Sequence, residues 1–132
     1  MLTVVAAVIE SAGKVLVCQR KRGDTFELLW EFPGGKLQAG ESPAEALARE
    51  LEEELGVHTR IGDELLRAKH QYAQMSEPID LIFLRATIAS GEIENRVFES
   101  IAWREPHTLP ELNFLPADRE LIHQLSTGKI KL

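Results

Sequence analysis

Residues 35–57 read GKLQAGESPAEALARELEEELGV and contain a helix whose two ends are both marked in the sequence. Ser42 is a good N-cap, Pro43 is favoured at the first helical position, and Glu45 completes a capping box with Ser42. Gly56 supplies the stop signal. The pattern therefore predicts a helix between Ser42 and Gly56. One apolar stripe runs along this helix and consists of Ala44, Leu47, Ala48, Leu51 and Leu55.

The same helix is crowded with acidic residues. It holds five glutamates and one basic residue, Arg49. Helical geometry places Glu50, Glu53 and Glu54 within roughly 100° of arc, where neighbouring carboxylates repel each other. The helix dipole favours acids only in the first turn and does not account for them. Two interpretations stay open from the helix alone: a solvated acidic face, or a site for a hard divalent cation, which takes oxygen ligands.

The residues that flank the helix favour the cation site. Gly34 and Gly35 allow the backbone to approach a ligand or a metal ion closely. Glu41 lies just before the N-cap, and Arg49 lies one turn from Glu53, so paired hydrogen bonds from Arg49 could orient the carboxylates. Mg²⁺ binds through carboxylates together with substrate phosphate oxygens, and carboxylates beside a glycine-rich loop therefore indicate phosphate chemistry.

The full spacing resembles a known signature. From Gly35 to Val57 it reads G, five residues, E, seven residues, REL, one residue, EE, one residue, GV. Every fixed position matches the Nudix box, the signature of the Nudix hydrolases. The preceding segment, residues 30–36 (WEFPGGK), is similar to the one before the box in the MutT-like branch. Weaker similarity in spacing extends to Arg20, Trp103 and residues 116–118.

The resemblance implies a fold, a reaction and a set of ligands. The fold would be the Nudix α/β/α sandwich, an α/β or α+β architecture with a mixed sheet between helices, formed by residues 1–132 as one domain. The reaction would be attack of water on a phosphorus of a nucleoside diphosphate derivative, with nucleoside monophosphate and pyrophosphate as products in the MutT-like branch. Glu50 is the candidate base, and Arg49 with Glu41 would hold loop and helix together. Mg²⁺ or Mn²⁺ would be bound by the carbonyl of Gly34 and by Glu50, Glu53 and Glu54.

One position departs from the family pattern. Some members carry a further catalytic glutamate six residues before the tryptophan, and that position is Val97 here. Glu99 matches a variant seen in other branches and is a candidate catalytic residue, while Glu94 is a second candidate. An exposed strand residue is an alternative interpretation of Glu99, so the identity of the additional base or ligand stays open.

Substrate selection in this family depends on residues outside the box. By resemblance, Arg20 would approach the triphosphate, Lys36 would join the substrate-binding residues, and Phe32 would form part of the base pocket, although it could equally be a core residue. Asp118 stands where MutT proteins that hydrolyse 8-oxo-dGTP carry an asparagine, and it resembles the CTP-directed branch and some 8-oxo-purine hydrolases. An ionised carboxylate accepts from the amino group of cytosine, and a protonated one can also donate. Alternatively, Asp118 caps the last helix.

The rest of the chain predicts a mixed sheet and a second helix. This helix begins near Pro116, ends at about Leu125 and is stopped by Gly128. Strands and helices in this order indicate an α/β or α+β domain packed in layers. The predicted extended segments are residues 3–9, 15–18, 30–32, 64–73, 79–88 and part of 92–104.

The composition narrows the classes of function. The chain has 132 residues, 44% of them hydrophobic and 27% charged, which suits one globular domain. A net charge of -6 argues against binding of polymeric nucleic acid. No stretch approaches the roughly 20 apolar residues of a membrane span. The single Cys18 suits a reducing cytosol, so we expect a cytoplasmic monomer or homodimer. The four histidines share no metal-ligand spacing.

The main hypothesis is an Mg²⁺-dependent nucleoside triphosphate pyrophosphohydrolase that removes 8-oxo-dGTP, (d)CTP or a modified dCTP from the nucleotide pool. A second hypothesis moves the substrate to a nucleotide sugar, a dinucleoside polyphosphate or a capped RNA end. A third is a non-catalytic Nudix module that binds nucleotides without hydrolysis. Such modules usually lose box glutamates, and this chain keeps them, which favours the enzyme.

Overall fold

The structure is a computed structural model that describes residues 2–132. It contains seven strands in one sheet, two α-helices and two short 3-10 helices. In chain order the elements are β1 (Leu2–Ser11), β2 (Lys14–Gln19), β3 (Trp30–Glu31), β4 (Gly34–Lys36), α1 (Pro43–Leu55), β5 (His58–His70), β6 (Ile79–Ser90), β7 (Ser100–Arg104), η1 (Pro106–Glu111), η2 (Pro116–Asp118) and α2 (Arg119–Ser126).

Strand β1 lies inside the sheet and is covered on both faces. It pairs parallel with β6 and antiparallel with β2 and β4. Val5, Ala7 and Ile9 belong to the core cluster that contains the buried face of α1. Ala6 and Val8 belong to the cluster that contains the buried face of α2. Because both faces are buried, the strand reads as a continuous apolar run instead of alternating with polar residues.

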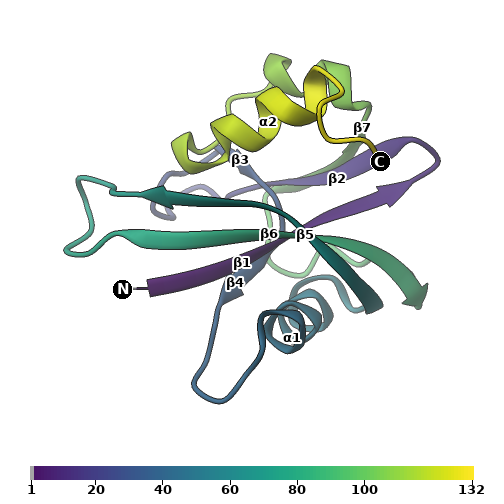
Figure 1. The fold of residues 1–132 in the computed structure, drawn as a ribbon, viewed down its shortest axis with the longest axis horizontal. Helices are drawn as coiled ribbons and strands as arrows, with labels where there is room; N and C mark the ends of the chain where they lie inside the picture. The colour runs from purple at the N-terminus through teal and green to yellow at the C-terminus, as the bar shows by residue number, and fades with distance from the viewer. Residues whose placement is uncertain (1) are drawn as a thin grey trace.

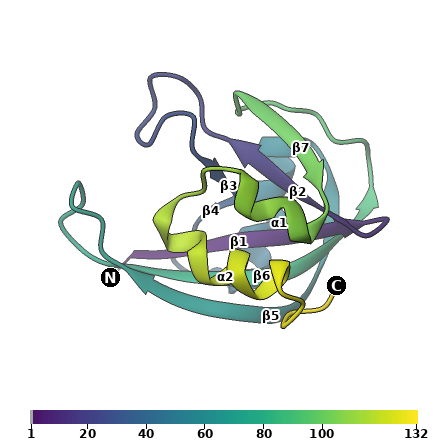
Figure 2. The ribbon, with the colours of Figure 1, turned by 90° about the horizontal axis from the view of Figure 1, so that it is seen from above.

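The helices cover opposite faces of the sheet, as Figure 1 shows with α2 above and α1 below. The strand order is β3-β2-β1-β6-β5, while β4 pairs with β1 and β7 pairs with β2. Seen from above, α2 crosses in front of the strands and α1 lies behind them (Figure 2). The predicted architecture, a mixed sheet between helices, is therefore confirmed.

Helix α1 is capped as predicted, with a small difference in its buried face. The capping box of Ser42 and Glu45 is present, and the C-cap Gly56 has φ 70°. The residues buried on α1 include Ala46, whereas Ala44 is exposed. The buried arc is thus turned toward the row that begins at Ala46 and continues, one turn at a time, through Glu50 and Glu54. With the buried face in this orientation, the carboxylates of Glu50 and Glu54 lie toward the sheet.

Other boundaries differ from the predictions. Strand β5 begins at His58 rather than at residue 64, and its pairing with β6 shifts register at several points. Polar residues and bulges are typical of an edge strand and conceal the period-2 pattern. The second helix is divided into η2 and α2. Strand β4 and helix η1 were not predicted, since Gly34–Gly35 and two prolines conceal them.

Two predictions about the whole chain can be compared with the described residues. No helix within residues 2–132 has the length and apolar character that crossing a membrane requires. Cys18 is a free, buried thiol in β2. Burial raises the pKa of this thiol far above its usual range, and the negative charges of Glu31 and Glu54 raise it further. A nucleophilic thiolate is therefore disfavoured.

Candidate active site

Two carboxylates of α1 lie against the short strand β4. The Gly34 amide donates a hydrogen bond to Glu54 Oε1 at 3.2 Å. A Cβ atom placed on Gly35 would lie 2.3 Å from Glu50 Cδ. Only glycine at position 35 therefore leaves the Glu50 carboxylate where it lies. The carboxylate occupies the space that a Gly35 side chain would fill, and we call this space the glycine cradle.

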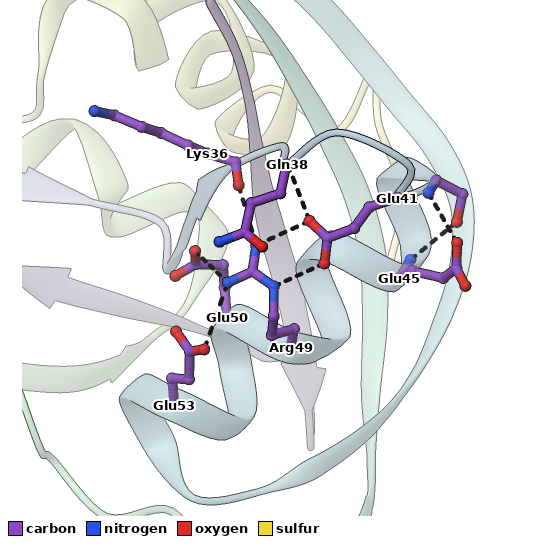
Figure 3. A network of polar contacts seen from close by, with 8 residues as sticks. Lys36, Gln38, Glu41, Glu45, Arg49, Glu50 and Glu53 are labelled. Atoms are coloured by element: carbon purple, nitrogen blue, oxygen red, sulfur yellow. Dashed lines mark hydrogen bonds and ion pairs between the residues drawn. The ribbon is translucent and has the colours of Figure 1, made fainter.

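Arg49 joins the acidic residues beside this cradle into one network (Figure 3). Its Nε donates to Glu41 Oε2 at 2.7 Å, and its Nη2 donates to Glu41 Oε1 at 3.0 Å. Its Nη1 donates to Glu50 Oε1 at 3.0 Å and to Glu53 Oε1 at 3.5 Å. A further bond from Nη2 reaches the carbonyl oxygen of Lys36 at 3.2 Å. The guanidinium therefore ties the loop after β4 to the glutamate face of α1.

Glu54 has a buried and acidic environment. Burial, together with the negative charges of Glu50 and Glu31, raises the pKa of Glu54 to about 8, although the hydrogen bond from Gly34 opposes the rise. A carboxylate in such surroundings is destabilised in its ionised form. A nearby positive charge would restore the ionised form.

The chemistry of these donors fits a hard divalent cation. Within the described residues, no three acidic, histidine or cysteine side chains converge closely enough to enclose an ion as they stand. Glu50 and Glu54 are engaged in hydrogen bonds, and the Glu53 side chain is 60% exposed. Glu50 and Glu54 beside the glycine cradle nevertheless provide oxygen ligands, and a cation bound there would favour the ionised form of Glu54. Ligation by these three carboxylates and the Gly34 carbonyl stays a prediction.

A cavity of about 550 Å³ connects Glu54 with Asp118, both of which line it. Asp118 reaches this cavity because the preceding segment pairs with β3. The Trp30 amide donates to the carbonyl of Asn113 at 2.9 Å, and the Leu115 amide donates to the carbonyl of Trp30 at 3.0 Å. One cavity thus contains a predicted metal ligand and a predicted base-pocket residue.

Asp118 is buried in the cavity wall without a partner for one of its oxygens. The residue is 3% exposed, and its Oδ2 has no hydrogen-bond partner among residues 2–132. Burial raises the pKa of Asp118 well above its usual range, and the charge of Glu31 raises it further. Asp118 stands at the N-cap position of α2, as the alternative interpretation requires, but its side chain makes no capping hydrogen bond to the helix. A ligand group that reached this oxygen would satisfy its hydrogen-bonding capacity.

Phe32 belongs both to the core and to the cavity wall. It is 4% exposed and lines the cavity. Its ring stacks on Phe114 with centroids 5.7 Å apart and meets the edge of Phe83 at 6.1 Å. The two interpretations of Phe32 are therefore compatible, because a fixed core ring can also present a surface to a ligand.

Arg20 lines the cavity together with Glu31, which the sequence pattern did not single out. Arg20 Nη1 lies 3.2 Å from both carboxylate oxygens of Glu31, and Arg20 Nε donates to the Thr25 carbonyl at 2.7 Å. Burial raises the pKa of Glu31 while the charge of Arg20 lowers it. A charged residue between Trp30 and Phe32 was the signal that could have identified Glu31.

Lys36 lines the cavity, whereas Glu99 and Glu94 are not among its lining residues. The Lys36 side chain points away from the carboxylate network in Figure 3. Glu99 Oε1 accepts from the Arg22 amide at 3.3 Å. Glu94 Oε2 accepts from Arg96 Nε at 3.1 Å. The catalytic role of an additional glutamate stays a prediction.

Comparison with known proteins identifies the same family as the sequence resemblance. The chain matches the NUDIX domain over residues 1–125. It is 35% identical to a CTP pyrophosphohydrolase of Escherichia coli K12 over 92% of this chain and 89% of that protein. It is 36% identical to an 8-oxo-dGTP diphosphatase of Haemophilus influenzae over 95% of this chain and 91% of the other. The solution structure of the E. coli ORF135 protein superposes with a TM-score of 0.84 and 30% identity, covering 98% and 91% of the two chains.

Proposed function

The chain belongs to the NUDIX family, and from that premise we propose that it is an Mg²⁺- or Mn²⁺-dependent nucleoside triphosphate pyrophosphohydrolase. It is a hydrolase of phosphoric anhydrides, in a family that generally uses divalent metal ions. The proposed products are a nucleoside monophosphate and pyrophosphate, and the proposed bases are oxidised guanine or cytosine. The observation that carries the proposal is one cavity lined both by Glu54, whose neighbour Glu50 lies outside the lining, and by Asp118, whose Oδ2 has no partner among the described residues.

The carboxylate side of the cavity would carry the reaction. A divalent cation bound there would neutralise phosphate charge and acidify water. Glu50 would accept the proton of the attacking water, and Arg49 keeps Glu50 oriented through its hydrogen bond at 3.0 Å. The proposed ligands are Glu50, Glu53, Glu54 and the Gly34 carbonyl.

The opposite side would select the nucleotide. Asp118 would bind the base edge, and Phe32 would offer an aromatic face to the ring. Arg20 and Lys36 would approach the phosphates, which gives a role to the two cationic residues in a largely apolar wall whose other charged residues are acidic. We further propose that the chain acts as one cytoplasmic domain, a monomer or homodimer, on free nucleotides.

Replacing Asp118 by asparagine is expected to change which nucleotide is preferred. Pyrophosphate release with Mg²⁺ would be measured across the four dNTPs, CTP, 8-oxo-dGTP and ADP-ribose. We expect kcat/KM of the wild type to be highest for 8-oxo-dGTP or for a cytosine nucleotide. Asp118→Asn should lower kcat/KM for that best substrate by about tenfold, the effect of one altered hydrogen bond to the base.

Asp63→Asn is the matched control, because the Asp63 side chain is 73% exposed and pairs with Arg85 at 3.4 Å, outside the cavity lining. It should leave the ranking of nucleotides unchanged. Preference for ADP-ribose would contradict the proposed substrate class. Nucleotide binding without any hydrolysis would contradict the enzyme and support a binding module.

A further inference from the structure

Tyr72 lies in the loop that follows β5 and lines the same cavity as Asp118. The residue is only 7% exposed. Its ring centroid lies 4.7 Å from that of Phe26 and 4.4 Å from that of His70. Phe26 also lines the cavity and comes from the loop between β2 and β3. The Tyr72 ring therefore contacts Phe26 of the β2–β3 loop and His70 at the end of β5, and it has little freedom to turn away.

The Tyr72 hydroxyl is bonded to the segment that carries Asp118. The Ala117 amide donates a buried hydrogen bond to Tyr72 Oη at 3.2 Å. Ala117 lies in the first turn of η2, where amides have no partner within the helix. Tyr72 satisfies this amide and so fixes the backbone immediately before Asp118.

The proton of the same hydroxyl has no acceptor in the part of the chain that the structure describes. A phenol can accept and donate at once, and the only hydrogen bond of Tyr72 Oη within residues 2–132 is the one that it accepts. Burial raises the pKa of Tyr72, the hydrogen bond from the Ala117 amide opposes the rise, and a negative charge on Asp118 adds to it, so the hydroxyl keeps its proton. Asp118 Oδ2 likewise has no partner among the described residues. A buried donor and a buried acceptor in one cavity wall are costly unless a ligand pairs with them.

We propose that Tyr72 is a specificity-determining residue. It positions Asp118 through the Ala117 amide, and its hydroxyl donates a hydrogen bond to an acceptor on the bound base. This inference rests on the proposed function, because it assumes that a nucleoside triphosphate occupies the cavity. The ligand class is a base that presents a carbonyl oxygen or an unprotonated ring nitrogen beside the group that meets Asp118. Without such an acceptor on the base, the Tyr72 proton would stay unpaired.

Tyr72→Phe tests this role because it removes the hydroxyl and keeps the ring. Steady-state kcat and KM would be measured with Mg²⁺ for the best and the poorest nucleotide of the wild type. We expect KM of the best nucleotide to rise about five- to tenfold, with a smaller change in kcat, and discrimination between the two nucleotides to fall. The melting temperature should drop by a few degrees, since the Ala117 amide loses its partner. Circular dichroism would show that the variant is folded.

Ser126→Ala is the control, because the Ser126 hydroxyl donates to the His123 carbonyl at 3.2 Å near the end of α2 and does not line the cavity. Its kinetic constants should equal those of the wild type. In an Asp118→Asn background, Tyr72→Phe should add less than about twofold to KM, because residues that act on one ligand couple non-additively.

Two results would overturn the inference. One is an equal loss for both nucleotides with unchanged ranking, which a purely structural tyrosine would give. The other is a KM that does not change in Tyr72→Phe. Failure of the proposed function would appear as absence of turnover by the wild type. Measuring the wild type in the same assay therefore distinguishes that failure from failure of this inference.

Discussion

Glu53→Gln is expected to lower kcat by about 10²–10³-fold and to leave the fold intact. The Glu53 side chain is 60% exposed, and its ion pair with Arg49 has a separation of 3.5 Å. Glutamine has nearly the same shape, so the free energy of unfolding should change by less than about 0.5 kcal/mol. The carboxylate charge is lost from the proposed cation site, and activity falls for that reason alone. The measurement is pyrophosphate release at saturating nucleotide, together with thermal unfolding.

Glu52→Gln is the matched control for this prediction. Glu52 is the preceding residue of α1, its side chain is 59% exposed, and its partner is His58 at 3.8 Å rather than Arg49. It should retain wild-type kcat. Equal activity of Glu53→Gln and Glu52→Gln would show that Glu53 does not bind the cation.

Gly35→Ala is expected to reduce kcat/KM by about 10²-fold while the protein remains folded. The added Cβ would lie 2.3–2.6 Å from the carboxylate atoms of Glu50, so the carboxylate must move. Glu50 has a flexible side chain, and the change in unfolding free energy should therefore stay within about 1 kcal/mol. A displacement of about 1 Å at a reacting group is enough to cost this much activity.

Two other glycines separate displacement of Glu50 from general damage. Gly62→Ala places its Cβ 3.5 Å from Arg85, an ordinary contact, and should have wild-type activity. Gly34→Ala places its Cβ 1.9 Å from the Val5 carbonyl oxygen, and should reduce stability by about 3 kcal/mol because β4 must leave β1. Full activity in Gly35→Ala would mean that the observed position of Glu50 is irrelevant to catalysis.

The features that could be predicted from the sequence are those encoded over short distances. The capping box of Ser42 and Glu45 and the stop at Gly56 are local, and they placed α1 correctly. The apolar run of residues 3–9 predicted a strand, and β1 is that strand, with residues in both core clusters. The spacing of the glutamates along α1 then followed from helical geometry alone.

The remaining features depend on segments that are distant in sequence. The bond between Tyr72 and Ala117 joins positions 45 residues apart, and the pairing of Arg20 with Glu31 requires β2 and β3 to adjoin. No local pattern encodes these contacts, so Tyr72 and Glu31 were missed. Asp118 was selected by resemblance, but its lack of a partner is visible only once the fold buries it.

The most direct test of the central claim is identification of the products formed from the best nucleotide by ³¹P NMR, with Mg²⁺ and then with excess EDTA. With Mg²⁺ we predict nucleoside monophosphate and pyrophosphate in equal amounts. With excess EDTA we predict no turnover, and we predict that turnover returns when Mg²⁺ is added back. Turnover that persists in EDTA, or release of inorganic phosphate with a nucleoside diphosphate, would contradict the proposed reaction.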